Sequence, residues 1–351
     1  MKRSKITICA DLAGCPNRCR HCWIGHTPNS NLTADDLREM ALKFRPYAEK
    51  LVVYDWYREP DFRDDYREKW ELCNSLSDEP RDHFELMSVW RGARDPAYVP
   101  WLASLGIKQM QLTLFGGRET TDRYTGRSGA YDEILNVIEK LIAHQISPRI
   151  QYFVYKDTVD ELSHLETLID SLNLNTRCQA FGGSFSCFVH GGSTDGAAEA
   201  LYENIITEAD LAKIPRRIAE YTLRHFDETN LHEVFGRPEH EWYAQLAADQ
   251  SVALLTEDEP VFFIDAEWNV YPNITAPETA WRLGNLKTES AEAILQTYLQ
   301  SESLAQKTRL TTPLGRIIRA VGDPQSNRLF GKGDYVQFCL NRYLRLSEAS
   351  K

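Results

Sequence analysis

The first half of the chain alternates between short apolar runs and longer segments whose apolar residues recur every three or four positions. The short runs have the length and composition of buried strands, and the longer segments have the period of amphipathic helices. The expected strands lie at 6–10, 51–54, 84–87, 108–114, 150–154 and 177–181. Six strand–helix units in succession favour parallel strands with helices on one face. We therefore predict an α/β fold over residues 1–182, an open, partial (β/α)6 TIM-like barrel.

Two of the predicted helices have a polar residue at their expected start. Thr33, with Asp36 three residues later, is typical of a capping box. Asp157 is the predicted N-cap of the helix that follows the strand at 150–154. The inward faces of these two helices are expected to consist of Leu37, Met40, Ala41, Phe44 and Tyr47, and of Leu162, Leu165, Ile169 and Leu172.

The second half of the chain has a different pattern. Glycine-rich segments between residues 182 and 196 predict loops, and residues 197–250 have the composition of helices. Two apolar runs within 261–273 predict a β-hairpin, and a helix is expected over 291–298. We therefore expect a carboxyl-terminal α+β extension at 183–351.

Composition excludes several classes of protein. The 351 residues include 51 Asp and Glu against 40 Lys and Arg, a formal net charge of −11, so nucleic acid and anionic membranes are not expected partners. No apolar stretch reaches the roughly 18 residues of a membrane span, and the amino terminus leads into a strand rather than a signal peptide. The eight cysteines are too few for a disulfide scaffold. We therefore expect reduced thiols and a cytoplasmic location.

The candidate chemistry lies directly after the first strand, where Cys15, Cys19 and Cys22 are spaced by four and three residues. A structural zinc site needs four ligands, usually in two separated pairs, and a redox dithiol needs a Cys-x-x-Cys pair that opens a helix. Three neighbouring thiolates suit three irons of a cubane cluster and leave the fourth iron open. Gly14 and Pro16 keep the segment irregular, so that the sulfur atoms can converge.

This motif resembles the signature of the radical S-adenosylmethionine (radical SAM) superfamily, Cys-x3-Cys-x-aromatic-Cys in the loop after the first barrel strand. The resemblance implies that Cys15, Cys19 and Cys22 bind one 4Fe-4S cluster, whose open iron binds S-adenosylmethionine (SAM). His21 stands where the family has an aromatic residue against the adenine. The supposed site therefore lies at the carboxyl ends of the strands, as in other barrel enzymes.

The resemblance also implies an activity. Reductive cleavage of SAM would give a 5′-deoxyadenosyl radical that takes a hydrogen atom from the substrate, with the electron supplied by an external donor such as flavodoxin or ferredoxin. We expect a small-molecule metabolite as substrate, for instance in natural-product biosynthesis, because only fourteen residues precede Cys15 and leave no room for a leader-peptide domain. Modification of a ribosomal peptide is the alternative. Oxidation, epimerisation, elimination and rearrangement all remain open as outcomes.

Further cofactor contacts follow from the resemblance. Glu59, in Tyr57-Arg58-Glu59-Pro60, aligns with the family's Gly-Gly-Glu-Pro, which holds the amino group of SAM, although the glycines are replaced. Thr113 and Arg118 lie in a segment similar to the family's fourth strand, which approaches the ribose and the carboxylate. These three residues and His21 are therefore the expected SAM ligands.

The extension resembles the SPASM or twitch extension of many radical SAM enzymes, in which a hairpin precedes a Leu-Gly-Asn segment and a helix. Those extensions have a cysteine after the Tyr-Pro pair, whereas this chain has Asn273. Outside the motif, only Cys178, Cys187 and Cys339 lie at or beyond the end of the expected barrel. We therefore expect no auxiliary cluster.

Two further hypotheses assign other roles to cysteines. Cys187, just past the sixth expected strand, is a speculative hydrogen-atom donor to a substrate radical, and its alternative is a buried loop cysteine. A rival of another class is a non-enzymatic module in which the three cysteines of the motif bind structural zinc together with His26.

Overall fold

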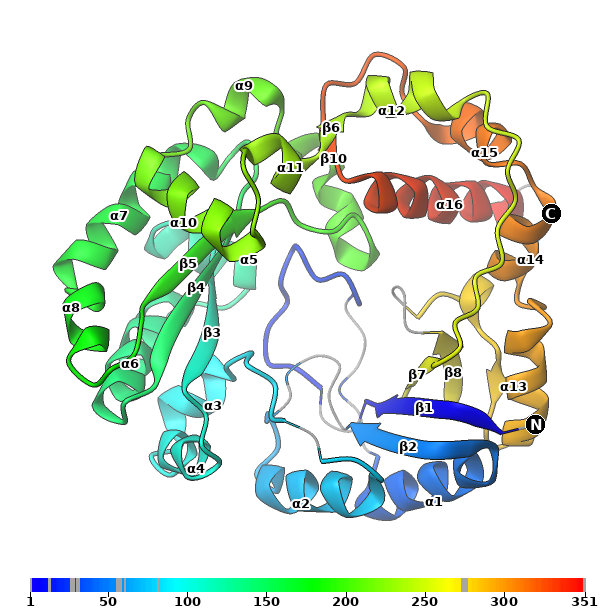
Figure 1. Ribbon diagram of the computed structural model, residues 1–351, viewed down its shortest axis with the longest axis horizontal. Helices are drawn as coiled ribbons and strands as arrows, with labels where there is room; N and C mark the ends of the chain where they lie inside the picture. The colour runs from blue at the N-terminus through cyan, green and yellow to red at the C-terminus, as the bar shows by residue number, and fades with distance from the viewer. Residues whose placement is uncertain are drawn as a thin grey trace.

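The computed structural model describes residues 2–11, 14–25, 29, 32–54, 59, 61–80, 82–272 and 277–349. The strands of these residues form a five-stranded sheet of order β2-β1-β7-β8-β9, a three-stranded sheet of order β3-β4-β5 and a two-stranded ribbon of β10 and β6. Figure 1 shows α6, α7 and α8 on one side of the three-stranded sheet and the blue amino-terminal loop on the other. The fold is therefore α/β with parallel strands, as predicted.

The first sheet is centred on β1 (Arg3–Ala10). This strand pairs in parallel with β2 (Ala48–Tyr54) on one side and with β7 (Val261–Ile264) on the other. Ile8 is completely buried between them. The sequence did not indicate that a strand of the extension would pair with β1, because periodicity predicts strands but not their long-range partners.

The predicted capping box of the first helix, α1 (Ala34–Phe44), is confirmed. The Thr33 hydroxyl accepts the Asp36 N–H at 3.2 Å, and the Asp36 carboxylate accepts the Thr33 N–H at 2.6 Å. Four of the five expected inward residues are buried, whereas Tyr47 lies in the following turn and is half-buried. The local pattern therefore defined this helix correctly.

The second sheet contains β3 (Gln109–Leu114), β4 (Ser147–Phe153) and β5 (Ser186–His190), all parallel. The expected strand at 84–87 does not form a full strand. Leu86 makes only an isolated parallel bridge to Gln111, which places this segment beside β3.

The expected strand at 177–181 is wrong, because this segment lies at the end of helix α8 (Leu174–Gln179) and in the turn after it. Leu174 and Cys178 are four residues apart and both buried, which is helical spacing. The sixth strand is β5 instead, and it lies beyond residue 182, inside the predicted extension.

Helix α7 (Leu162–Ser171) begins later than predicted. Its N-cap is Glu161, the last residue of a short 3-10 turn, η2 (Val159–Glu161), so Asp157 does not cap it. The Asp157 carboxylate instead accepts a hydrogen bond from the Tyr124 hydroxyl at 2.6 Å. Of the expected inward residues, Leu162, Leu165 and Ile169 are buried and Leu172 is partly buried.

The first half of the chain contains further helices. They are α2 (Tyr66–Leu76), α3 (Val89–Arg94), α4 (Tyr98–Ser104), α5 (Arg118–Thr125) and α6 (Ala130–Ala143). Apolar side chains of β3 and β4 pack against α6 and α7 in one large core. None of the helices in the described part of the chain is long and apolar enough to cross a membrane.

The second half of the chain consists mainly of short helices. Its elements are η3 (Gly196–Asn204), α9 (Glu208–Leu211), α10 (Arg216–Phe226), α11 (Leu231–Phe235), β6 (Arg237–Pro238), α12 (Glu239–Leu246), η4 (Thr279–Trp281), β9 (Gly284–Asn285), α13 (Ala291–Leu299), α14 (Leu304–Thr311), α15 (Leu314–Val321), β10 (Leu329–Phe330) and α16 (Lys332–Ala349).

The predicted hairpin of the extension is confirmed. β7 pairs antiparallel with β8 (Asn269–Pro272), and β9 and α13 follow as expected. Asn273 lies outside the described residues. Because β7 also pairs with β1, the hairpin continues the first sheet instead of forming a separate layer.

Candidate active site

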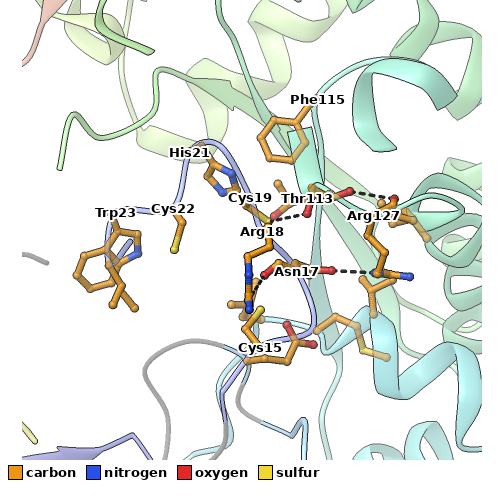
Figure 2. A pocket seen from close by; sticks show the side chains of 18 of the residues that line it. Cys15, Asn17, Arg18, Cys19, His21, Cys22, Trp23, Thr113, Phe115 and Arg127 are labelled. Atoms are coloured by element: carbon orange, nitrogen blue, oxygen red, sulfur yellow. Dashed lines mark hydrogen bonds between the residues drawn. The ribbon is translucent and has the colours of Figure 1, made fainter. Parts of the chain in front are cut away.

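A cavity of about 190 Å³ opens beside the loop that follows β1. Figure 2 shows that this loop and the carboxyl end of β3 supply much of its wall. The lining includes the three motif cysteines, His21, Glu59, Thr113, Phe115 and Arg127. The structure therefore gathers most of the residues selected from the sequence around one space, at the edge of the sheet where barrel enzymes have their sites.

The cysteine loop is held in place by the end of α5. The Arg18 N–H donates to the Thr125 carbonyl at 2.9 Å, and the Arg20 N–H donates to the Tyr124 carbonyl at 2.8 Å. Gly126, with φ of +67°, allows this close approach, since a Cβ atom there would lie 2.8 Å from the Arg18 carbonyl oxygen. The loop therefore depends on a segment more than a hundred residues away.

The three cysteines face the same cavity. Burial raises the pKa of the Cys19 thiol, and the neighbouring Cys15 and Cys22 raise it further because adjacent thiolates repel. Within the described part of the chain, no three His, Cys, Asp or Glu side chains are arranged closely enough to hold a metal ion. The donor set is nevertheless all sulfur, which suits iron, and bound cations would reverse the repulsion.

His21 lies between aromatic rings. Its ring centroid is 4.6 Å from that of Phe115 and 4.3 Å from that of Phe153. Burial, with a further effect of nearby His190, lowers the pKa of His21 to about 3, so the imidazole is neutral at neutral pH. Its Nδ1 atom is buried and has no hydrogen-bond partner in the described structure. Such an atom is suited to a bound group.

Glu59 has a similar unused atom. Its Oε1 is buried without a hydrogen-bond partner among the described residues. Burial raises the pKa of Glu59 to about 7, although a hydrogen bond with Ser88 opposes the shift. A cation bound at this carboxylate would restore its ionised form. The neighbouring Tyr57, Arg58 and Pro60 lie outside the described residues.

Thr113 faces the cavity because side chains alternate along β3. Met110, Leu112 and Leu114 face the helices and are buried, whereas Thr113 lies on the opposite, inner face. Its hydroxyl donates to Gln151 Oε1 at 3.3 Å. The inner face of the sheet also has polar residues that were not selected from the sequence, namely Gln111, Arg149 and Gln151.

Residues 12–170 match the family model described as the radical SAM superfamily. This part of the chain is a radical SAM domain. Three solved structures similar to the whole chain are "Native anSMEcpe with bound AdoMet" (TM-score 0.54, 13% identity, covering 99% of this chain and 100% of that one), "Native anSMEcpe with bound AdoMet and Kp18Cys peptide" (0.52, 11%, 98% and 99%) and "Native anSMEcpe with bound AdoMet and Cp18Cys peptide" (0.51, 12%, 99% and 100%). At such identity the likeness concerns the fold. No curated protein matches the chain in sequence.

The expected cofactors of the radical SAM domain are confirmed as those of its superfamily, a 4Fe-4S cluster and SAM. The donor chemistry of the cavity fits both groups. Three thiols line the cavity and are suitable iron ligands, and the buried Glu59 Oε1 and His21 Nδ1 can form hydrogen bonds to a polar ligand.

Arg118, in contrast, does not line this cavity. It is the first residue of α5, where its side chain is about half exposed and forms an ion pair with Asp132. The cations that line the cavity are Arg18 and Arg127. Of these, Arg127 donates to Asn17 at 2.9 Å and pairs with Glu133 at 2.6 Å. Its position between Gly126 and Gly129 was the signal, since glycines often mark turns beside a site.

Cys187 also lies away from the radical SAM site. Residues on β5 alternate, so Cys187 and Val189 face the outer helices, whereas His190 faces the inner side. The Cys187 side chain is completely buried among apolar residues, and burial raises its pKa to about 12. The structure therefore gives no path from its sulfur to the cavity and does not support a hydrogen-donor role.

Proposed function

We propose that this chain is a radical SAM enzyme in which Cys15, Cys19 and Cys22 hold the 4Fe-4S cluster. The observation that carries the proposal is that all three line one cavity within the matched domain, beside buried polar atoms that lack partners in the described structure. We further propose that β1, β2, the bridged segment at 84–87 and β3–β5 form an open, partial (β/α)6 barrel. The parallel bridge from Leu86 to Gln111 supports this continuity.

In this proposal, the chain's own side chains orient SAM. The Glu59 carboxylate accepts hydrogen bonds from the amino group, and Arg127 pairs with the carboxylate. The Thr113 hydroxyl binds the ribose, and the neutral His21 imidazole contacts the adenine. The unpartnered atoms of Glu59 and His21 support these roles, because a buried polar group without a partner costs about 1–3 kcal/mol.

When bound, the two cofactors would supply hydrogen-atom abstraction: one electron from the reduced cluster would cleave the bond between sulfur and C5′ of SAM into methionine and a 5′-deoxyadenosyl radical. The aromatic wall of His21, Phe115 and Phe153 excludes water from the place where that radical would form. Thr113 and Arg127, held by hydrogen bonds to neighbouring elements, keep the ligand in one orientation.

We propose a small-molecule metabolite as the substrate. A peptide is the second candidate, since two similar structures are described with bound Kp18Cys and Cp18Cys peptides, at 11% and 12% identity. The two candidates differ in size. A small substrate can be enclosed by the barrel and extension, whereas a peptide must leave part of its chain outside.

We also propose that the cluster is the sole one and is reduced by an external flavodoxin or ferredoxin. Cys178 and Cys187 lie in the core between β3–β5 and their helices, whereas Cys339 lies in a different core formed by the extension. Because these thiols lie in separate cores, they support a SPASM- or twitch-like extension that binds no iron. Such an extension would shape the substrate pocket.

The proposal is tested by anaerobic reconstitution with iron and sulfide, followed by reduction and measurement of 5′-deoxyadenosine. We expect about four irons per chain and SAM-dependent formation of 5′-deoxyadenosine. A triple variant with alanine at Cys15, Cys19 and Cys22 should bind almost no iron.

A colourless protein with one zinc, held by the three cysteines and His26, would overturn the proposal in favour of a structural zinc module. His26 lies outside the described residues. Iron and sulfide retained by the triple variant would instead contradict the single cluster.

A further inference from the structure

A second cavity, of about 100 Å³, lies between the radical SAM domain and the extension. Its wall combines the carboxyl ends of β4 and β5 with β10 and the first turn of α16. The residues that carry its chemistry are Tyr155, His190, Gly192, Thr194 and Asp334. Pockets for drug-sized ligands span roughly 300–1,000 Å³, so this cavity has room only for a small group.

The second cavity is adjacent to the cysteine loop. Residues 190–197 form a short connection after β5, and its first part, up to Thr194, lines the cavity. Its last part contacts the loop, where the Ala197 N–H donates to the Cys22 carbonyl at 2.9 Å. A group bound in the second cavity therefore lies just across this connection from the proposed cluster ligands.

Tyr155 indicates that the second cavity is built for a ligand. Its side chain is 1% exposed, and its hydroxyl has no hydrogen-bond partner in the described structure. A Cβ atom at Gly192 would lie 2.0 Å from this hydroxyl, so only glycine leaves the space that the hydroxyl occupies. An unpaired buried hydroxyl is costly, and a polar ligand in the cavity would satisfy it.

Asp334 gives the second cavity its charge. It forms no ion pair and no hydrogen bond through its side chain within the described part of the chain, where no Lys or Arg lines this cavity. Asp334 keeps an exposed side, and the desolvation of its carboxyl by neighbouring atoms raises its pKa. Its place in the first turn of α16 favours the carboxylate, since helix amino termini attract negative charge. His190 adds no positive charge, because burial lowers its pKa to about 4. A cation bound here would hold Asp334 in its ionised form.

We propose that this second cavity binds a protonated amino group of the substrate, with Asp334 and the Tyr155 hydroxyl as acceptors. The inference rests on the proposed function, and it makes the substrate an alkylamine whose carbon chain extends toward the cysteine loop. The small cavity selects a primary ammonium at the end of that chain. The apolar residues Ile205, Ile206 and Phe330 contact the adjoining methylene groups.

The test is ligand-observed saturation-transfer NMR on the full chain without cluster or SAM, with n-butylammonium chloride as probe. The matched probes 1-butanol and sodium butyrate have the same carbon chain without the positive charge. We expect n-butylammonium to bind at least about tenfold more tightly than either one. Because the measurement requires no radical chemistry, it is independent of 5′-deoxyadenosine formation, which tests the proposed function separately.

Two variants and one control locate the binding. Asp334→Asn should weaken n-butylammonium binding by about tenfold or more, and Tyr155→Phe by about threefold to tenfold. The Phe variant removes an oxygen atom that bonds to nothing in the described structure, so it should melt at no lower temperature than the wild type. As the control, Glu292→Gln removes a carboxylate from the first turn of a different helix, α13. It should leave the affinity for n-butylammonium unchanged.

Equal affinity for butyrate and n-butylammonium would overturn the inference, as would unchanged binding in both Asp334→Asn and Tyr155→Phe. Absence of n-butylammonium binding to a chain that forms 5′-deoxyadenosine would also overturn it. Binding that depends on Asp334 in a chain that forms no 5′-deoxyadenosine would support the amine site and place the failure in the proposed function.

Discussion

The two cavities differ in how the chain builds them. The first is formed largely by one continuous loop after β1, completed by β3 and the end of α5, and a sequence motif marks it. The second is formed by residues from β4, the connection after β5, and α16, which are far apart in the chain. Cofactor chemistry common to a superfamily can be concentrated in a motif, whereas recognition of a particular substrate depends on contacts between distant segments.

The largest expected effect is a difference in 5′-deoxyadenosine formation between variants of Cys19, which lines the first cavity, and Cys187, which lies in the core. Cys19→Ala should lower 5′-deoxyadenosine formation by at least about a thousandfold, because an iron loses its ligand, while the far-ultraviolet circular dichroism stays unchanged. Cys187→Ala should leave this rate within about twofold and lower the melting temperature slightly, since its side chain fills the apolar core. Normal 5′-deoxyadenosine formation in the Cys19 variant would show that Cys19 is not a cluster ligand.

A smaller effect should distinguish two arginines. Arg127→Ala should raise the KM for SAM by about tenfold to a hundredfold, because its guanidinium lines the first cavity. Arg118→Ala removes a half-exposed ion pair with Asp132 and a cation–π contact with Tyr131, both outside the first cavity, and should change KM less than about twofold. The opposite ranking in steady-state kinetics would show that SAM approaches α5 from its other end.

One added methyl group should destabilise the connection at residues 190–197, which lies between the two cavities. Gly196 has φ of +56°, and a Cβ atom would lie 2.5 Å from the Trp23 carbonyl oxygen. Gly196→Ala should therefore lower the free energy of unfolding by about 1–3 kcal/mol, measured by denaturant titration, and slow 5′-deoxyadenosine formation.

Gly106→Ala is the control for backbone strain alone. Gly106 also has a positive φ, of +81°, but nothing in the described structure lies within 4 Å of its added Cβ. This variant should cost less stability than Gly196→Ala and leave activity unchanged. An equal loss in both would mean that contact with the cysteine loop contributes little.

The smallest expected effect is a pH dependence at Asp195, on the same connection. Burial raises the pKa of Asp195 to about 6, while a hydrogen bond from Asn341 at 2.6 Å opposes the shift. Because the folded pKa lies above the ordinary value, the stability from this group is present below about pH 4 and is lost as pH rises through 6. In Asp195→Asn, the melting temperature should therefore fall less than in the wild type between about pH 4 and pH 7. If the melting temperatures of the two proteins changed equally with pH, this prediction would be contradicted.

Features that depend on neighbouring residues were readable from the sequence. The Thr33 capping box, the hairpin at 261–273 and the spacing of the motif cysteines all involve residues within a few positions of one another. Their geometry follows from helix period, strand alternation and turn chemistry, which act locally. Glu59 and Thr113 also line the first cavity, because each follows or lies on a predicted strand whose carboxyl end faces the site. Their role as SAM ligands stays a prediction.

What the tertiary structure decided is which distant segments meet. Apolar periodicity is the same for many strand partners, so it did not show that β7 pairs with β1, or that β5 follows α8 and directs Cys187 into the core. A shift of one position in a strand exchanges its two faces. The whole of α5 separates Arg118, which is half exposed, from Arg127, which lines the first cavity. The second cavity brings together Tyr155, Gly192 and Asp334, and such a meeting depends on packing across the whole chain rather than on any local pattern.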